Sequence, residues 1–146
     1  MLQTKISNLI QTTQKIENLL SELENPQNLN LLIESIKDFF NQYTQIENIL
    51  TSIIQTKVSN HPVDHKNIEF RILQNFQNVN TFYTNFLSIV NNIKEVEKLN
   101  FTNKNKMINL QIESLKNQKE YIITLVQELT LLIMDVKELI ENFEKS

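Results

Sequence analysis

Apolar side chains recur at alternating spacings of three and four residues through four stretches of this chain, and no other feature constrains the fold as strongly. Because an α-helix has 3.6 residues per turn, such a spacing lines one face of a helix. A β-strand would need a period of two, which the chain nowhere holds for long. One stretch shows the pattern plainly, running through Leu29, Leu32, Ile36, Phe39, Tyr43, Ile46, Leu50 and Ile53. The periodicity predicts an all-α protein whose helices pack side by side.

Two prolines and one polar stretch divide the pattern into four helices. Pro26 follows an asparagine, a good N-cap, and suits the first helical position, where its missing N–H is not needed. Pro62 lies in a polar segment, and we expect that segment to be a loop closed by Asp64 as the next N-cap. The third break, 100–105, is polar and poor in helix formers, with Thr102 as the expected cap.

These breaks predict one helical domain over residues 1–146, an elongated antiparallel bundle or coiled coil of three to four long helices. Further apolar residues beside the main stripes widen them, which indicates packing against more than one neighbouring helix. The expected lengths are unequal, from about 33 Å to about 63 Å at 1.5 Å per residue. The longest helix should therefore project from the bundle or pack on another chain. The predicted helices span 3–24, 27–58, 65–98 and 103–144.

The composition excludes several classes of active site. The chain has no glycine, which phosphate-binding loops, dinucleotide-binding turns and nucleophile elbows all require. It has no cysteine either, so disulfides, iron–sulfur clusters and thiolate zinc sites are excluded. Lack of cysteine also favours a reducing, intracellular compartment.

Charge and hydropathy argue against two kinds of partner. The formal net charge is −3 and no segment is strongly basic, so binding to a nucleic-acid backbone is not expected. The N-terminus lacks the apolar stretch of a signal peptide. The most apolar window, 121–134, is interrupted by polar residues and is shorter than the ~18 residues that a membrane span needs. We expect a soluble protein with no nucleic-acid or membrane partner and no small-molecule substrate.

The residues with metal-binding or catalytic chemistry do not form a site at the sequence level. His61 and His65 flank Asp64, but Pro62 breaks the helical spacing between them and no third ligand recurs nearby. No Ser, His and Asp are arranged as a triad. We therefore expect no enzyme activity, no metal and no cofactor.

Three amides interrupt the apolar stripes: Asn75 in the third helix and Gln111 and Gln118 in the fourth. Either the stripe is partly exposed to solvent there, or the amides meet polar groups of a partner subunit. They are also the only polar groups that a helical enzyme or ligand carrier could use inside the bundle.

The stretch 115–140 resembles the C-terminal helix of the Mediator subunit 30 family. It carries a Leu-Lys pair, a run of amides and an aliphatic seam that ends in Leu132-Ile133-Met134-Asp135-Val136. Upstream, 73–76 (Leu-Gln-Asn-Phe) and 82–87 are similar to that family's middle helix, so the resemblance spans about 40–140. Met134 stands where the family has an aromatic residue, and Thr130 stands where it has an arginine.

The resemblance implies a non-enzymatic coiled-coil subunit of the Mediator coactivator complex in the nucleus, which helps couple transcription regulators to RNA polymerase II. Its partners would be the other protein subunits of a hetero-oligomeric complex. The alternative is a coiled-coil subunit of a cytoplasmic tethering, trafficking or cytoskeletal complex. In either reading we expect the fourth helix to be the docking helix, through Ile122, Leu125, Leu129, Leu132, Ile133, Val136 and Leu139.

Overall fold

The computed structural model contains four long helices packed antiparallel as a bundle, which confirms the predicted all-α class. Their bounds are α1 Leu2–Ser21, α2 Leu29–Lys57, α3 Pro62–Lys98 and α4 Lys104–Lys145. The structure describes residues 2–23, 29–57 and 62–145, without the side chains of 57, 62–65 and 142–145.

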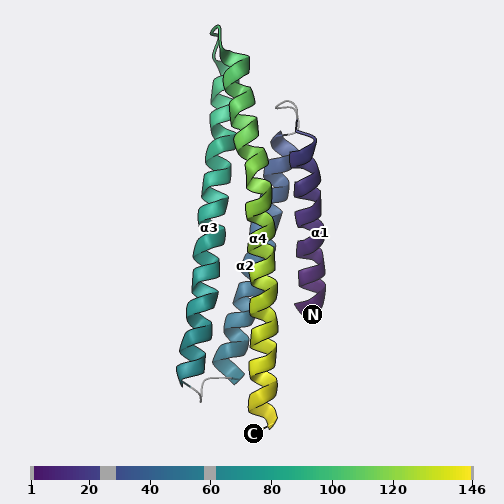
Figure 1. The fold of residues 1–146 in the computed structure, drawn as a ribbon, viewed down its shortest axis with the longest axis vertical. Coiled ribbons are helices and arrows are strands. Elements are labelled where there is room, and N and C mark those ends of the chain that lie inside the picture. The colour runs from purple at the N-terminus through teal and green to yellow at the C-terminus, as the bar shows by residue number, and fades with distance from the viewer. Residues whose placement is uncertain (1, 24–28, 58–61, 146) are drawn as a thin grey trace.

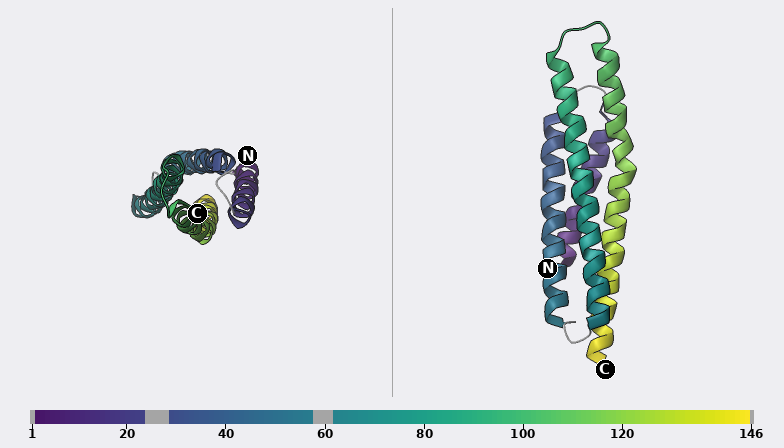
Figure 2. Two further views of the ribbon diagram at one scale, coloured as in Figure 1. Left: turned by 90° about the horizontal axis from the view of Figure 1, so that it is seen from above. Right: turned by 90° about the vertical axis from the view of Figure 1, so that its left-hand side faces the viewer.

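The helices run alternately up and down, and each packs against the next one in the chain (Figure 1). The last helix, α4, returns against α1, so the four close into a ring when seen end-on (Figure 2). This is the up-down-up-down arrangement that short connections between helices favour.

The apolar stripes meet along the axis of the bundle, as their spacing predicts. Aromatic side chains join α2 to α3: Phe40 stacks on Tyr83 with ring centroids 4.4 Å apart, and Phe39 meets Phe82 edge-on at 6.1 Å. Almost all of the core comes from positions on the predicted stripes. Its fully buried members include Leu9, Ile16, Leu20, Leu32, Ile36, Phe39, Tyr43, Ile46, Leu50, Val79, Phe82, Phe86, Ile93, Leu115, Ile122, Leu129 and Leu132.

The predicted start of α3 is three residues too late, and that of α4 is one residue too early. Helix α3 begins at Pro62 and not at 65, because proline's fixed φ and missing N–H suit the first helical position. Asp64 therefore lies inside the first turn and is not the N-cap. In α4, the amide of Met107 donates to the carbonyl of Asn103 at 3.1 Å, so Asn103 and not Thr102 occupies the N-cap position.

The end of the first helix is also earlier than predicted. Helix α1 ends at Ser21, and the chain continues in a turn in which the amide of Leu23 donates to the carbonyl of Leu20. Leu23 stays buried in the core although it has left the helix. The predicted start at Pro26 lies outside the described residues.

The helices differ greatly in length, with 20 residues in α1, 29 in α2, 37 in α3 and 42 in α4. As a result, α3 and α4 project beyond α1 and α2 at one end of the elongated molecule (Figure 1). At the other end α1 stops short of α2 and α4 (Figure 1). These two places, the projecting hairpin and the edge beside α1, are where the bundle is incomplete.

Candidate interaction surface

The residues predicted to dock a partner lie mostly inside the bundle. Ile133 and Leu139 are partly buried against the core. The other five are at most 3 % exposed: Ile122, Leu125, Leu129, Leu132 and Val136. Ile122, Leu125, Leu129 and Leu132 pack against the chain's own helices, so binding through them stays a prediction that would require the bundle to open. Ile133 and Val136 also line a groove at the surface. An aspartate at Leu129 or Leu132 would disrupt the fold itself and could not report on a partner.

A groove lies between α4 and α1, which is the shortest of the four helices. It has a volume of about 510 Å³ and is closed at its base by α2. Its apolar lining comes from three helices: Leu2 and Ile6 of α1, Leu50 and Ile53 of α2, and Ile133, Met134, Val136 and Ile140 of α4.

The apolar surface continues from this groove along α1 and α4 toward the middle of the bundle. A shallower cleft of about 480 Å³ is lined there by Ile10, Val126 and Leu131, together with Gln127 and Thr130. Leu131 and Met134 stand on the exposed side of α4, with 58 % and 59 % of their surface in solvent. The sequence prediction did not include these two residues among the docking residues, because they lie outside the apolar stripe of α4 on which it was based.

Polar side chains form the smaller part of the groove's lining. The hydroxyl of Thr130 donates to the carbonyl of Val126 in its own helix at 2.9 Å. Gln3 and Lys137 complete the lining. A ligand in this groove would therefore meet mainly apolar side chains, which suits a hydrophobic side-chain stripe better than a polar metabolite.

A second, smaller cleft between α3 and α4 is polar. Its volume is about 260 Å³, and Arg71, Asn75 and Glu128 are among its lining residues. Arg71 is already paired with Asp135 at 2.8 Å, so its guanidinium is not free for an anionic ligand. Since both members of the pair are about half exposed, we interpret it as a surface ion pair between neighbouring helices.

Within the described residues, Glu47 is a buried carboxyl group with one oxygen that lacks a hydrogen-bond partner. Glu47 of α2 is 3 % exposed, and its Oε1 has no hydrogen-bond partner among the described residues. Burial raises the pKa of Glu47 to about 8, so the group is largely neutral at neutral pH. Tyr43, one turn earlier, donates to the carbonyl of Leu125 at 3.5 Å. Burial, and then the charges of Glu47 and Glu128, raise the pKa of Tyr43.

This pair does not have the geometry of a catalytic site. Glu47 and Tyr43 face the closed core, and neither lines any of the clefts described above. A general acid or base needs a path to a substrate. We therefore interpret the raised pKa of Glu47 as a consequence of its burial in the fold and not as a sign of catalysis. The sequence signal that could have revealed this burial is the position of Glu47 directly beside the apolar stripe of α2.

The amides expected to interrupt the seams are half-buried: Asn75 on α3, and Gln111 and Gln118 on α4. The first of the two interpretations, a partly exposed stripe, agrees with this burial. The side chains of His61 and His65 lie outside the described residues. Over the part of the chain whose side chains are described, no three His, Cys, Asp or Glu residues cluster as metal ligands would.

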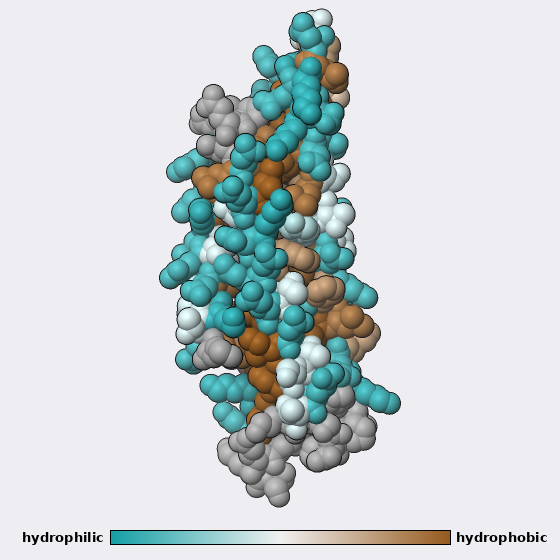
Figure 3. Space-filling model, turned by 180° about the vertical axis from the view of Figure 1, so that it is seen from behind, coloured by the Kyte–Doolittle hydropathy of each residue, from teal (hydrophilic) through white to brown (hydrophobic). Residues whose placement is uncertain are grey.

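Comparison with known proteins does not identify this chain. No protein-family model, no curated protein and no solved structure matches it. Within the described residues, every helix falls short of the length or the apolar character needed to cross a membrane. On the face seen from behind the view of Figure 1, hydrophobic patches interrupt a mostly hydrophilic surface (Figure 3).

Proposed function

We propose that this protein is a non-enzymatic helical subunit of a multi-protein complex, and that it binds an amphipathic helix of a partner subunit along the groove between α1 and α4. The observation that supports this most is the pair of adjoining, mainly apolar clefts between Ile140 and Val126, bordered by the exposed side chains of Leu131 and Met134. Monomeric proteins seldom leave such surfaces in water without a partner.

The spacing of the lining residues suits a helix in particular. On α4, Val126, Ile133 and Ile140 recur every seven residues, and on α1, Leu2, Ile6 and Ile10 recur every four. Side chains at these spacings form the holes into which the apolar stripe of another helix fits. The distance from Val126 to Ile140 is about 21 Å along the helix, so a partner helix of about four turns would fill it.

The resemblance of 115–140 to the Mediator subunit 30 family names the first complex to test, with a nuclear location and a role in RNA polymerase II transcription. A cytoplasmic tethering, trafficking or cytoskeletal complex remains the alternative, since it would use the same helix packing. The location of a tagged copy in cells separates the two proposals.

The groove can be tested without unfolding the bundle, because two of its border residues are exposed. Leu131→Asp combined with Met134→Asp should leave the helical content and the thermal transition nearly unchanged, and should remove the partner subunits that co-purify with the tagged wild-type chain. Mass spectrometry identifies those subunits. The charges act by making docking of an apolar helix unfavourable.

Phe70→Asp is the matched control, since Phe70 is 65 % exposed on α3 and does not line the groove. It should keep the full set of partners. If the α4 double variant retained every partner, or if the control lost the same ones, the groove would not be the docking site. Mediator subunits among the lost partners would support the nuclear proposal, and their absence from the wild-type preparation would contradict it.

A further inference from the structure

The tip of the α3–α4 hairpin, defined here as residues 98–112, differs from the rest of the chain in charge. It carries Lys98, Lys104 and Lys106 and no acidic residue. The remaining 131 residues have a formal net charge of −6, because the whole chain has −3. Lys98 lies 3.5 Å from Glu95, one turn below the tip, in an exposed ion pair that solvent screens. The tip is thus a local positive end on an acidic protein.

The same fifteen residues are unusually rich in exposed apolar side chains. Four of the eleven large hydrophobic residues that are exposed in the described part of the chain lie here: Leu99, Phe101, Met107 and Leu110. The inward positions of the tip are already filled, since Ile108 and Ile112 are buried. The four exposed side chains therefore keep a large part of their surface in solvent, from 38 % in Phe101 to 60 % in Leu110.

The position of the tip determines what it can contact. It is the convex end of the hairpin that projects beyond α1 and α2 (Figures 1 and 2). Leu110 lies six residues into α4, or about 9 Å from the start of that helix, so all four exposed side chains lie within that depth of the loop. Apolar faces of peripheral membrane helices enter the headgroup region to a depth of about 5–10 Å.

The small size of the tip favours a lipid surface over a protein. A specific protein–protein interface uses about 20–30 residues on each side, and the tip offers fifteen, of which some are turned inward. A membrane has no such minimum, because each inserted side chain and each lysine near anionic headgroups adds to binding. We propose that residues 98–112 insert end-on into the interface of a membrane that contains anionic phospholipids. This contact is peripheral and needs no membrane-spanning helix, although the sequence alone led us to expect no membrane partner.

The first test is flotation of the purified full chain with vesicles. The wild type should float with phosphatidylcholine vesicles that contain phosphatidylserine, much less with phosphatidylcholine alone, and less as salt is raised. Phe101→Ser with Met107→Ser should weaken binding at least tenfold, and so should Lys98→Gln with Lys106→Gln. All of these side chains are exposed, so the fold should survive, as circular dichroism would check.

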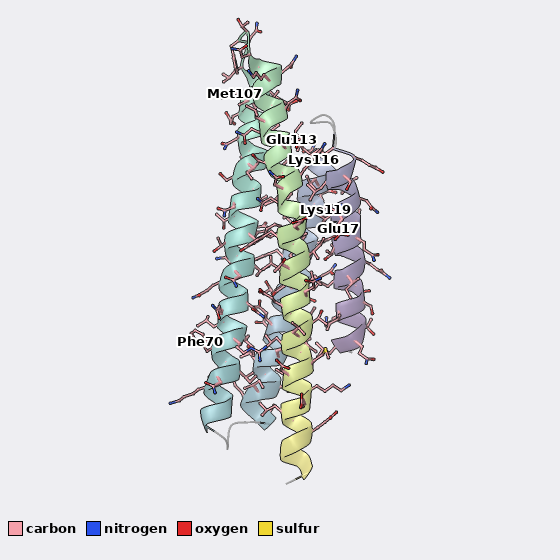
Figure 4. The ribbon with its side chains drawn as sticks, in the orientation of Figure 1. Glu17, Phe70, Met107, Glu113, Lys116 and Lys119 are labelled. Atoms are coloured by element: carbon pink, nitrogen blue, oxygen red, sulfur yellow. The ribbon has the colours of Figure 1, made fainter. Side chains whose placement is uncertain are left out.

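The opposite end of α3 offers a matched control. Phe70 and Met107 lie far apart along the bundle (Figure 4), and Lys66 lies one turn from Phe70. Phe70→Ser with Lys66→Gln makes the same kind of change away from the tip and should bind vesicles like the wild type. If the wild type did not bind the anionic vesicles, or if the control pair weakened binding as much as the tip variants, the proposal would be overturned.

A second readout uses the absence of tryptophan from the chain. In Phe101→Trp the only indole sits at the tip, and its fluorescence should shift to shorter wavelength and be quenched by brominated lipid when anionic vesicles are added. In Phe70→Trp neither change should occur. Unchanged emission at position 101 in the presence of bound vesicles would overturn insertion. Tip variants that still bind vesicles but lose a co-purifying protein would assign the tip to an acidic protein partner instead.

Discussion

Glu47 is a carboxylic acid in an environment that disfavours its charged form. It lies on α2, one turn after Tyr43, and only 3 % of its surface is exposed. A carboxylate there would lose its hydration without gaining a partner, which is why burial raises the pKa of Glu47 from 4.5 to about 8. The neutral acid is the form that the folded protein tolerates.

This environment predicts a dependence of stability on pH. Since the pKa of Glu47 is higher in the folded than in the unfolded chain, its contribution is fully present below pH 4.5 and is lost as pH rises toward 8. Glu47→Gln should therefore raise the free energy of unfolding at pH 8 by about 1–4 kcal/mol and change it little near pH 4.5. Urea denaturation at the two pH values measures the difference.

Glu34→Gln on the same helix is the control, because Glu34 is exposed. Its effect should be small at both pH values. An equal gain from Glu47→Gln at pH 4.5 and pH 8 would mean that desolvation of the charge is not the cause.

At the scale of a helix, α4 has two apolar faces, one buried in the core and one exposed to solvent. Its stripe through Leu125, Leu129 and Leu132 is buried against the chain's own helices, while Leu131 and Met134 face solvent two residues away. The sequence prediction that α4 docks a partner did not separate these two faces. Both are apolar, so composition cannot distinguish them, and only the positions of the neighbouring helices can.

The two faces should respond differently to the same truncation. Leu129→Ala should lower the free energy of unfolding by about 2–5 kcal/mol, because it leaves a cavity in a closed core. Leu131→Ala should change it by no more than about 0.5 kcal/mol, since the side chain is 58 % exposed. Denaturant unfolding of the two variants provides the comparison, and similar losses in both would contradict the assignment of the faces.

At the scale of the whole molecule, the unequal helix lengths divide the bundle into regions of different support. Four helices surround the core in the middle, but only α3 and α4 pack together at the projecting end (Figure 1). Fewer apolar neighbours mean a lower free energy of local opening.

Hydrogen exchange should therefore vary along α3 and α4. Amides in 93–98 and 104–112 should exchange faster than those of the same two helices in 79–90 and 115–130, and mass spectrometry of the full chain can resolve these segments. Uniform protection from end to end would show that the projecting hairpin is as stable as the four-helix region. In that case a partner, or a second copy of the chain, would be supporting it.

The sequence by itself determined the class of the fold, because helical periodicity is a local property that each segment carries without its neighbours. The seams of all four helices and the projection of the longest one follow from this periodicity. The positions beside the seams do not. Ile54 is fully buried, whereas Ile53, which the stripe pattern favoured, is half-buried.

Only the tertiary structure decided such flanking positions. A helix with 3.6 residues per turn drifts against a strict heptad pattern, so the buried flank changes along its length according to which helix lies beside it. The same reason explains why Glu47 is buried and why Leu131 is exposed. The groove and the apolar tip arise from where neighbouring helices begin and end, and these are relations between segments that no single stretch of the sequence contains.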